Sequence, residues 1–272
     1  MTTARAGVTT MTTGSDDLEA QLTRLKLFYL AKNLADFVAR TTKKRLGPQE
    51  IVEEIAKFEL DEAKRRGIES RLTAASLGRY RPFADFDWKW PKRINREGIE
   101  RLFTLAFLEE PANVILVGPA GVGKTMIAKN LGYQAAMAGH SVLFEDASKM
   151  LTDLGQQDSP RALEHRLRRY VRPHLLVVDE VGYLSYSTRA ADLMFQIVSR
   201  RYEHGATILT TNVPFKEWGT VFPGAACASV MIDRLTHHAE IQLIEGDSYR
   251  KKESAERPSR RNPKTPEKSR ED

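Results

Sequence analysis

The residues best suited to chemistry form a glycine-rich stretch near the middle of the chain. The stretch fits the pattern G-x-x-x-x-G-K-[ST], and it lies between an apolar run and a segment of helical composition. In such a loop, backbone N–H groups surround phosphate oxygens, and the dipole of the following helix favours negative charge. We therefore predict a nucleoside triphosphate site, in which Lys124 contacts the β- and γ-phosphates and Thr125 binds Mg²⁺. Its residues are Gly118, Pro119, Ala120, Gly121, Val122, Gly123, Lys124, Thr125 and Met126.

Two adjacent carboxylates follow a strongly apolar run later in the chain. Residues 175–178 are leucine and valine, and Asp179 and Glu180 come directly after them. The carboxyl ends of parallel strands meet at one edge of a sheet, which would put these acids beside the phosphate loop. We predict that Asp179 binds Mg²⁺ and that Glu180 acts on the attacking water. Without the glycine-rich motif, such a pair is more often a solvated turn.

A third polar position follows the apolar run at 207–210. Asn212 comes just after this run, and a parallel sheet would bring its amide near the γ-phosphate, where it would sense the state of the nucleotide. The alternative is an ordinary turn leading into Pro214. We keep Asn212 as a predicted site residue.

Hydrolysis also needs positive charge where the phosphoryl group develops negative charge. In oligomeric ATPases a neighbouring subunit often supplies this charge as an arginine. Arg234 is the first candidate, Arg201 the second and Arg200 a weaker third, while a salt bridge is the alternative for each. His237 and His238 follow Arg234, but the sequence gives them no further ligand, so we assign them no chemistry.

The elements that position these residues form an α/β pattern. Five short apolar runs, at 114–117, 142–144, 175–178, 207–210 and 241–244, alternate with helical stretches. This order predicts a mostly parallel five-stranded sheet covered by helices on both faces, within a domain at 111–249. Residues 79–110 form a linker and a first helix. There, Trp88 and Trp90 either border the base of the nucleotide or join two domains.

The N-terminal part predicts a small helical domain at 18–78. Apolar residues at three- and four-residue steps indicate one amphipathic helix over 18–40, and Gly47-Pro48 starts a second helix that Gly67 ends. The polar leader at 1–17 and the basic tail at 250–272 contain few large apolar residues. We expect both segments to be disordered.

Composition narrows the class of protein. The 272 residues carry a formal net charge of +6, which is compatible with a polyanionic partner but does not demand one. Cys227 is the single cysteine, so the chain cannot form an internal disulfide. No run approaches eighteen apolar residues, and no secretory signal precedes the first helix. We expect a cytoplasmic protein without a membrane partner.

The longer motifs resemble one known family. GPAGVGKT, LLVVDEVGYL, SRRYEHG, TTNVPFKEWGTVF and IDRLTHHAEIQLIEGDSYR are similar to the IstB-like ATP-binding proteins, helper ATPases of bacterial insertion-sequence transposases that are related to the DnaC helicase loaders. The resemblance runs from about Leu18 to Arg250 and implies an AAA+ P-loop NTPase fold. It implies Walker A, Walker B, sensor and arginine-finger roles for Lys124, Thr125, Asp179, Glu180, Asn212 and Arg234. Met126 departs from the histidine of many relatives, and too few residues follow Arg234 for a full helical lid.

The resemblance also implies a function. It indicates an ATPase that uses Mg²⁺, forms homo-oligomers through its ATP sites on duplex DNA and works with a transposase. We expect contacts mainly to DNA phosphates, with little sequence preference. The predicted DNA-binding residues are Lys43, Lys44, Arg45, Lys64, Arg65 and Arg66. The first alternative is a helicase loader that acts on single-stranded DNA, and the second is a DNA-coating protein that does not hydrolyse ATP.

Overall fold

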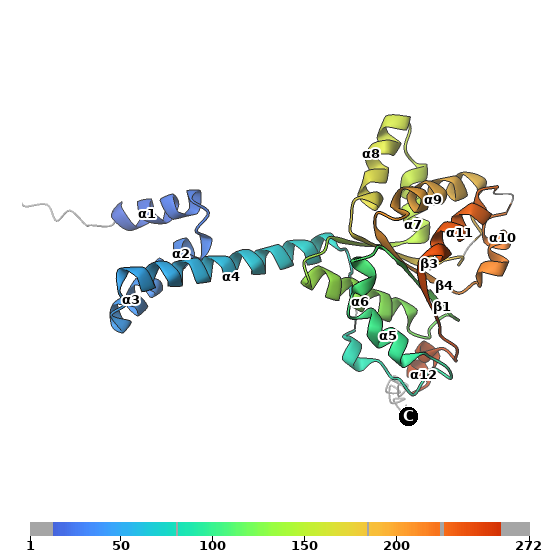
Figure 1. Cartoon of the computed structure of the whole chain (residues 1–272), viewed down its shortest axis with the longest axis horizontal. Coiled ribbons are helices and arrows are strands. Elements are labelled where there is room, and N and C mark those ends of the chain that lie inside the picture. The colour runs from blue at the N-terminus through green and yellow to red at the C-terminus, as the bar shows by residue number, and fades with distance from the viewer. Residues whose placement is uncertain (1–12, 80, 184, 224–225, 257–272) are drawn as a thin grey trace, which may run out of the picture. The chain divides into compact units, whose positions relative to one another are not determined.

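The chain folds as two compact units. The computed structural model describes residues 13–79, 81–183, 185–223 and 226–256, and the units are Met1–Ser70 and Arg71–Asp272. The first unit is helical, as predicted (Figure 1). It contains α1 (Thr13–Arg24), α2 (Phe28–Lys32), α3 (Leu34–Lys44) and most of α4 (Pro48–Ala74). Within the described residues, no helix is both long enough and apolar enough to cross a bilayer.

The N-terminal unit has its own small core. The prediction of one helix over 18–40 is wrong, because the segment is divided among α1, α2 and α3. Lys26 has a left-handed φ of 63° between α1 and α2, where the chain turns. The turn lets Leu22, Leu30 and Phe37 share one buried cluster. Partly buried side chains that complete it include Ile51, Ile55 and Phe58 of α4.

Helix α4 begins where the sequence predicts and ends later. Pro48 is its first residue, and the N–H of Gly47 donates to Glu50 Oε2 at 2.7 Å. The prediction that Gly67 ends the helix is wrong. An interior glycine costs roughly 1 kcal/mol relative to alanine. Two ion pairs of Arg65, with the carboxylates at positions 62 and 69, offset part of this cost.

The second unit contains the predicted sheet. Its strands are β1 (Asn113–Val117), β2 (Val142–Asp146), β3 (Leu175–Val181), β4 (Ala206–Thr211) and β5 (Ala239–Leu243). Their order is β2-β3-β4-β1-β5, and every neighbouring pair is parallel. The five predicted strands and the α/β class are therefore confirmed.

Helices cover both faces of the sheet, and each face has its own apolar core (Figure 1). Along β1, Ile115 belongs to one core, and Val114 and Leu116 belong to the other. Helix α6 (Lys124–Met137) packs in the core of Leu116. The opposite core contains residues of α7 (Ala147–Gly155), α8 (Pro160–Val171), α9 (Thr188–Arg201) and α11 (Ala228–His237). A short 3₁₀ turn (Phe215–Glu217) and α10 (Trp218–Val221) connect β4 to α11.

The segment predicted as a linker packs on the core of the second unit. It contains 3₁₀ turns at Phe83–Asp85 and Ala106–Leu108 and helix α5 (Arg96–Leu102). Phe86 is buried, and its ring centroid lies 5.0 Å from that of Trp88. Trp90 Nε1 donates to the carbonyl of Asp247 at 2.8 Å. These contacts lie within one unit, which corrects the interpretation that the two tryptophans join the domains.

The predicted disorder at the two ends is partly wrong. Helix α1 includes residues 13–17, and α12 (Tyr249–Glu256) includes the start of the predicted tail. Polar contacts replace apolar burial in α12: Lys252 Nζ lies 3.3 Å from Asp87 Oδ2 and 4.6 Å from the centre of the Trp90 ring. The predictions for residues 1–12 and 257–272 lie outside the described residues.

Candidate nucleotide site

The glycine-rich loop joins the end of β1 to the N-terminus of α6. Strand β1 ends at Val117 and α6 begins at Lys124, so the backbone N–H groups of the helix start face the loop. The N–H of Gly118 donates to the carbonyl of Thr211 on β4 at 3.1 Å, which fixes the loop to the sheet. This is the strand–loop–helix arrangement that the motif requires for phosphate binding.

The ammonium group of Lys124 lies inside this loop. Its Nζ donates to the carbonyls of Gly118 and Pro119 at 2.6 and 2.7 Å, and only 9% of the residue is exposed. Burial lowers the pKa of Lys124 to about 8, although the charges of Asp179 and Glu180 act in the opposite direction. An anion bound in the loop would restore the charged form. The site therefore favours a phosphate group over a neutral ligand.

Asp179 is the centre of a hydroxyl–carboxylate cluster. Its Oδ1 accepts hydrogen bonds from Thr125 Oγ1 at 3.0 Å and from Thr210 Oγ1 at 2.5 Å. The residue is buried, with 7% exposed. Carboxylate and hydroxyl oxygens are hard ligands of the kind that Mg²⁺ prefers, and Mg²⁺ commonly binds one or two of them together with phosphates. The donor set at Thr125 and Asp179 therefore fits the predicted magnesium site.

Glu180 projects from a bulge in β3. The register with β4 shifts between Val178 and Val181, and Glu180 has a left-handed φ of 62°. Its N–H donates to Thr210 Oγ1 at 3.0 Å, and the residue is exposed while its neighbours in β3 are buried. The bulge thus turns Glu180 out of the sheet beside buried Asp179. This is a suitable position for a group that contacts water.

Asn212 lies at the sheet edge between the loop and the carboxylates. Thr211, the last residue of β4, pairs with Val117 of β1 and with Val181 of β3. The next residue, Asn212, is exposed. This placement agrees with a position near the γ-phosphate, and the sensor role of Asn212 stays a prediction.

Arg201 has a structural role, which corrects its place among the predicted catalytic residues. The residue is 2% exposed, and its guanidinium donates to backbone carbonyls from two neighbouring segments and to Thr207 Oγ1. The carbonyls belong to Tyr170, Val171, Pro173, His174 and Ala206. Burial lowers the pKa of Arg201 to about 10. A group held in this way cannot reach the phosphates of another subunit.

Arg234 is partly exposed on α11. It donates to Ser199 Oγ, and its guanidinium carbon lies 5.2 Å from the centre of the Phe195 ring. Arg200 is exposed and pairs with Glu164 at 2.8 Å. Neither Arg234 nor Arg200 is buried as Arg201 is, and the finger role of Arg234 stays a prediction.

A segment that sequence reasoning missed lies against the loop. A Cβ placed on Gly118 would lie 2.1 Å from the carbonyl oxygen of Ile244, and one placed on Gly121 would lie 2.2 Å from Ser248 Oγ. The N–H of Tyr249 donates to the carbonyl of Gly121 at 2.9 Å. Residues 244–249, which we name the C-terminal strap, therefore explain why these positions of the loop are glycine.

Arg250 follows the C-terminal strap, at the start of α12. Its charge lowers the pKa of Lys124, which places it close enough to act on the site electrostatically. From the sequence, Arg250 was predicted to begin a disordered tail. The usable signal was its position at the end of the GDSYR motif, which is part of the family resemblance.

Comparison with known proteins identifies the family. A family model described as IstB-like ATP binding protein matches residues 20–257. The chain belongs to this family. It is 37% identical over 237 residues to an ATP-binding protein of insertion sequence IS21 from Pseudomonas aeruginosa, covering 87% of this chain and 89% of the relative. It is 35% identical to an ATP-binding protein of insertion sequence IS232 from Bacillus thuringiensis subsp. berliner, covering 87% and 94% of the two chains.

The fold of this IstB-like protein also matches solved structures. The crystal structure of DnaI superposes with a TM-score of 0.51 at 18% identity, covering 62% of this chain and 92% of DnaI. At this identity the similarity concerns the fold alone. It supports the predicted α/β fold, in which helices flank a five-stranded parallel sheet.

Proposed function

We propose that this IstB-like protein is an ATPase that assembles with ATP on duplex DNA and acts there with an insertion-sequence transposase in the cytoplasm. The observation that carries the proposal is the ATP site itself. Lys124, Thr125, Asp179 and Glu180 come together at one edge of the sheet, in a chain that matches the family model over 20–257. The relatives are named as ATP-binding proteins of insertion sequences, which supports the link to transposition.

Each residue of the site has its own role in the proposed ATP hydrolysis. Thr125 Oγ1 and Asp179 Oδ1 would hold Mg²⁺, which neutralises phosphate charge when bound. Lys124 binds the phosphates, and Glu180 orients and deprotonates the attacking water from its exposed position on the bulge. Asn212 contacts the γ-phosphate and reports whether it is present.

Assembly completes the site. Arg234 lies on α11, where its guanidinium packs against the rings of Phe195 and Tyr202. We assign Arg234 to the ATP site of a neighbouring subunit, where it stabilises the charge that develops during phosphoryl transfer. Within its own subunit, Arg250 supplies positive charge next to Lys124. ATP would thereby link subunits, and the loss of the γ-phosphate would weaken that link.

Some of the six predicted DNA-binding residues of the N-terminal unit already pair their charge with a carboxylate. Arg65 bonds the carboxylates of Glu62 and Glu69 at 2.6 and 2.5 Å, and Lys44 lies 3.6 Å from Glu54. A DNA phosphate would have to displace these partners. We keep the six predicted residues as DNA contacts of the N-terminal unit. Because some of their charges are already paired, we add a second surface on the ATPase unit.

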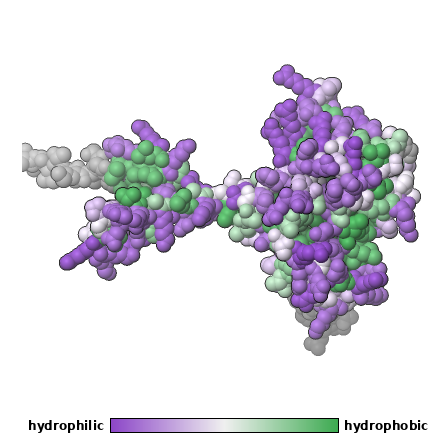
Figure 2. All heavy atoms as spheres, viewed as in Figure 1, coloured by the Kyte–Doolittle hydropathy of each residue, from purple (hydrophilic) through white to green (hydrophobic). Residues whose placement is uncertain are grey.

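This second surface is α8. Its buried face holds Leu167 and Tyr170, and its exposed face is rich in arginine. Hydrophilic residues dominate this part of the surface in Figure 2. Its one acidic residue, Glu164, is shared between Arg168 and Arg200. The surplus positive charge suits nonspecific phosphate contact. The exposed arginines of the α8 surface are Arg161, Arg168, Arg169 and Arg172.

The N-terminal unit also presents apolar side chains to solvent, and we assign these to the transposase. Leu25 is 70% exposed, and Val52 and Leu60 are 64% and 61% exposed. Figure 2 shows apolar residues gathered on this unit. Exposed apolar residues rimmed by charge are typical of protein–protein contact.

One experiment tests the proposal as a whole. Assembly of the protein on duplex and on single-stranded DNA would be measured by sedimentation with and without ATP, at several salt concentrations, for the wild type and Lys124→Ala. We expect ATP-dependent, salt-sensitive multimers on duplex DNA that Lys124→Ala does not form. A clear preference for single strands would replace this proposal with the helicase loader. Assembly without ATP turnover would favour the DNA-coating protein.

A further inference from the structure

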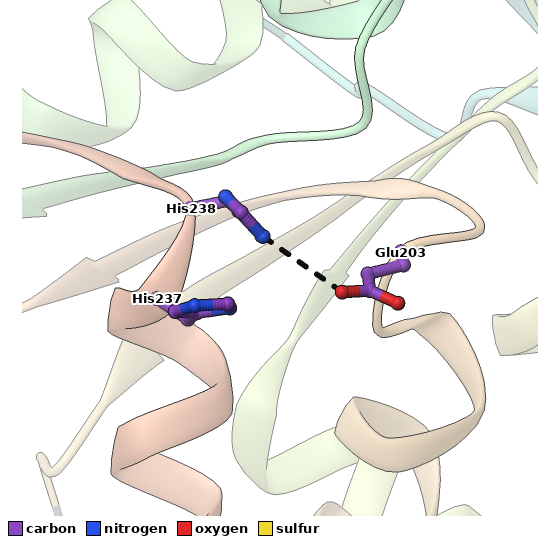
Figure 3. A group of neighbouring side chains, drawn as sticks. All are labelled: Glu203, His237 and His238. Carbon is purple, nitrogen blue, oxygen red and sulfur yellow. Dashed lines mark ion pairs between the residues drawn. The ribbon is translucent and has the colours of Figure 1, made fainter.

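Two histidines that the proposed function does not use meet an acidic residue in the structure. His237 is the last residue of α11 and His238 follows it, while Glu203 lies in the turn between α9 and β4. One ligand atom from each of the three residues lies within 4.8 Å of the others. The side chain of His238 points toward Glu203, and His237 lies beside them (Figure 3). We propose that Glu203, His237 and His238 bind a divalent transition-metal ion of the zinc type.

The backbone allows two consecutive histidines to face one point. His237 still has helical geometry, but His238 has φ −123° and ψ 74°, so the chain leaves the helix between them. The two imidazole ring centroids are 4.0 Å apart. His238 Nε2 lies 3.8 Å from Glu203 Oε1, a separation that an ion between them would bridge with small side-chain movements.

A neighbouring hydroxyl orients the first histidine. Tyr202 Oη and His237 Nδ1 are 2.6 Å apart, and the two rings stack at 28°. When Nδ1 donates its proton to this hydroxyl, the lone pair of Nε2 is available to a metal. Ligating histidines commonly use the second ring nitrogen in this way, which fixes the tautomer and the ring orientation.

The ligand set selects the class of ion. Two imidazoles and one carboxylate suit Zn²⁺, Co²⁺ and their neighbours, whereas Mg²⁺ prefers oxygen ligands alone. Three protein ligands leave at least one position for water, and all three residues are exposed. The site is therefore exchangeable, and it is separate from the Mg²⁺ site proposed at Thr125 and Asp179.

A bound metal ion would link two segments of the second unit. The ion would join the end of α11 to the turn that follows α9, and Tyr202 of that turn also contacts the guanidinium of Arg234, 5.9 Å from its ring centre. The existence of the metal site does not depend on the proposed function. Its effect on Arg234 in a neighbouring ATP site does rest on that function.

Direct metal binding tests the site. Tag-free full-length protein, stripped with chelator, would be titrated with Co²⁺ while visible absorption is recorded, and with Zn²⁺ by calorimetry in excess Mg²⁺. The variants are His238→Ala, Glu203→Gln and Tyr202→Phe, and His204→Ala is the matched control because His204 is exposed in the same turn. Thermal unfolding without metal would establish that each variant is folded.

We expect one ion per wild-type chain and the same affinity in His204→Ala. His238→Ala and Glu203→Gln should weaken binding at least tenfold, and Tyr202→Phe should weaken it by about tenfold through the loss of its hydroxyl. Wild-type affinity in both ligand variants, or the absence of one-to-one binding in the wild type, would overturn the metal site. None of these measurements uses ATP or DNA, so a failure here is distinct from a failure of the proposed function.

Discussion

Tyr249 donates its backbone N–H to the carbonyl of Gly121 at 2.9 Å, and this bond joins the C-terminal strap to the phosphate loop. Gly121 has a φ of 83°, and a Cβ there would lie 2.2 Å from Ser248 Oγ. We predict that Gly121→Ala displaces the C-terminal strap and abolishes measurable nucleotide binding. The cost in unfolding free energy should exceed the roughly 1–3 kcal/mol expected of a strained backbone alone.

Gly139→Ala is the matched control for this change. Gly139 has a comparable φ of 108°, but nothing lies within 4 Å of the position of its Cβ. Chemical unfolding and binding of a fluorescent ATP analogue would be measured for both variants. Gly139→Ala should lose stability and keep nucleotide affinity. Equal affinity in the two variants would show that the C-terminal strap has no part in the site.

Thr210 organises both acidic residues of the site. Its Oγ1 donates to Asp179 Oδ1 at 2.5 Å and accepts from the N–H of Glu180 at 3.0 Å. We predict that Thr210→Val lowers the ATP turnover number by at least tenfold, since Glu180 loses its position, and destabilises the fold by about 1–3 kcal/mol. Thr207→Val on the same strand is the control, because Thr207 Oγ1 accepts from Arg201 instead.

Turnover and unfolding measurements separate the two threonines. Both variants remove a buried hydroxyl from β4, so both should lose stability. Only Thr210→Val should lose turnover once the folded fraction is taken into account. A similar turnover in both variants would mean that the bulge holds Glu180 without the hydroxyl.

The parts of the site that follow directly from a strand are those that the sequence predicted. Apolar runs at 114–117 and 175–178 determine the strand ends, and the glycine-rich motif and Asp179 come directly after them. A parallel sheet brings such ends to one edge irrespective of their distance in the chain. This regular geometry explains why the sequence could place the loop, the acids and Asn212 at one edge of the sheet, while their roles stay predictions.

The parts that depend on particular tertiary contacts were not predicted. Arg201 and Arg234 are the same residue type on neighbouring helices, and only the carbonyls around Arg201 show that it is buried. Helix α12 is held by Lys252 and Asp87, which are 165 positions apart. No local pattern reveals contacts of this range. For the same reason, the sequence did not show that Glu203 lies next to His237 and His238.

The depressed pKa of Lys124 gives a pH-dependent prediction. Its folded-state pKa of about 8 lies below the ordinary value of 10.5, so the unfolded state binds more protons between these values and this group's contribution to stability rises with pH there. Bound phosphate favours the charged form. We predict that nucleotide binding takes up about half a proton at pH 8 and nearly one at pH 9.

Calorimetry in buffers with different ionisation enthalpies measures this uptake. The affinity for the nucleotide should fall by about tenfold for each pH unit above 9, because protonation then costs free energy. The phosphates of the nucleotide are fully ionised in this range and contribute little. Proton uptake that does not change between pH 7.5 and 9 would contradict the assignment to Lys124.

The α8 surface predicts a specific effect on salt dependence. Arg161 and Arg168 are exposed on this helix, and their replacement by glutamine removes two positive charges without touching buried Leu167 or Tyr170. We expect weaker DNA binding and a slope of log affinity against log salt that is smaller by about 2. Filter binding at four salt concentrations checks this. An unchanged slope in this double variant, with a reduced slope in Lys43→Gln/Lys64→Gln, would place the DNA contacts on the N-terminal unit alone.

The contrast between Arg201 and Arg234 gives the last prediction. Arg201→Met leaves several buried carbonyls without a donor, so we expect a loss of more than about 3 kcal/mol of unfolding free energy. Arg234→Ala removes a partly exposed group, so its stability should change little. Its ATP turnover on DNA should nevertheless fall by about 10³-fold if it completes a neighbour's site.

Mixing two inactive variants tests whether Arg234 acts between subunits. Glu180→Gln keeps Arg234 and ATP binding but cannot activate the attacking water, and Arg234→Ala keeps the site but lacks the finger. In an equal mixture, about a quarter of the interfaces pair an intact site with an intact arginine, so turnover should return to about that fraction of wild type. If Arg234 served only its own subunit, or only the packing of α11 against Phe195 and Ser199, the mixture would be as inactive as its two components.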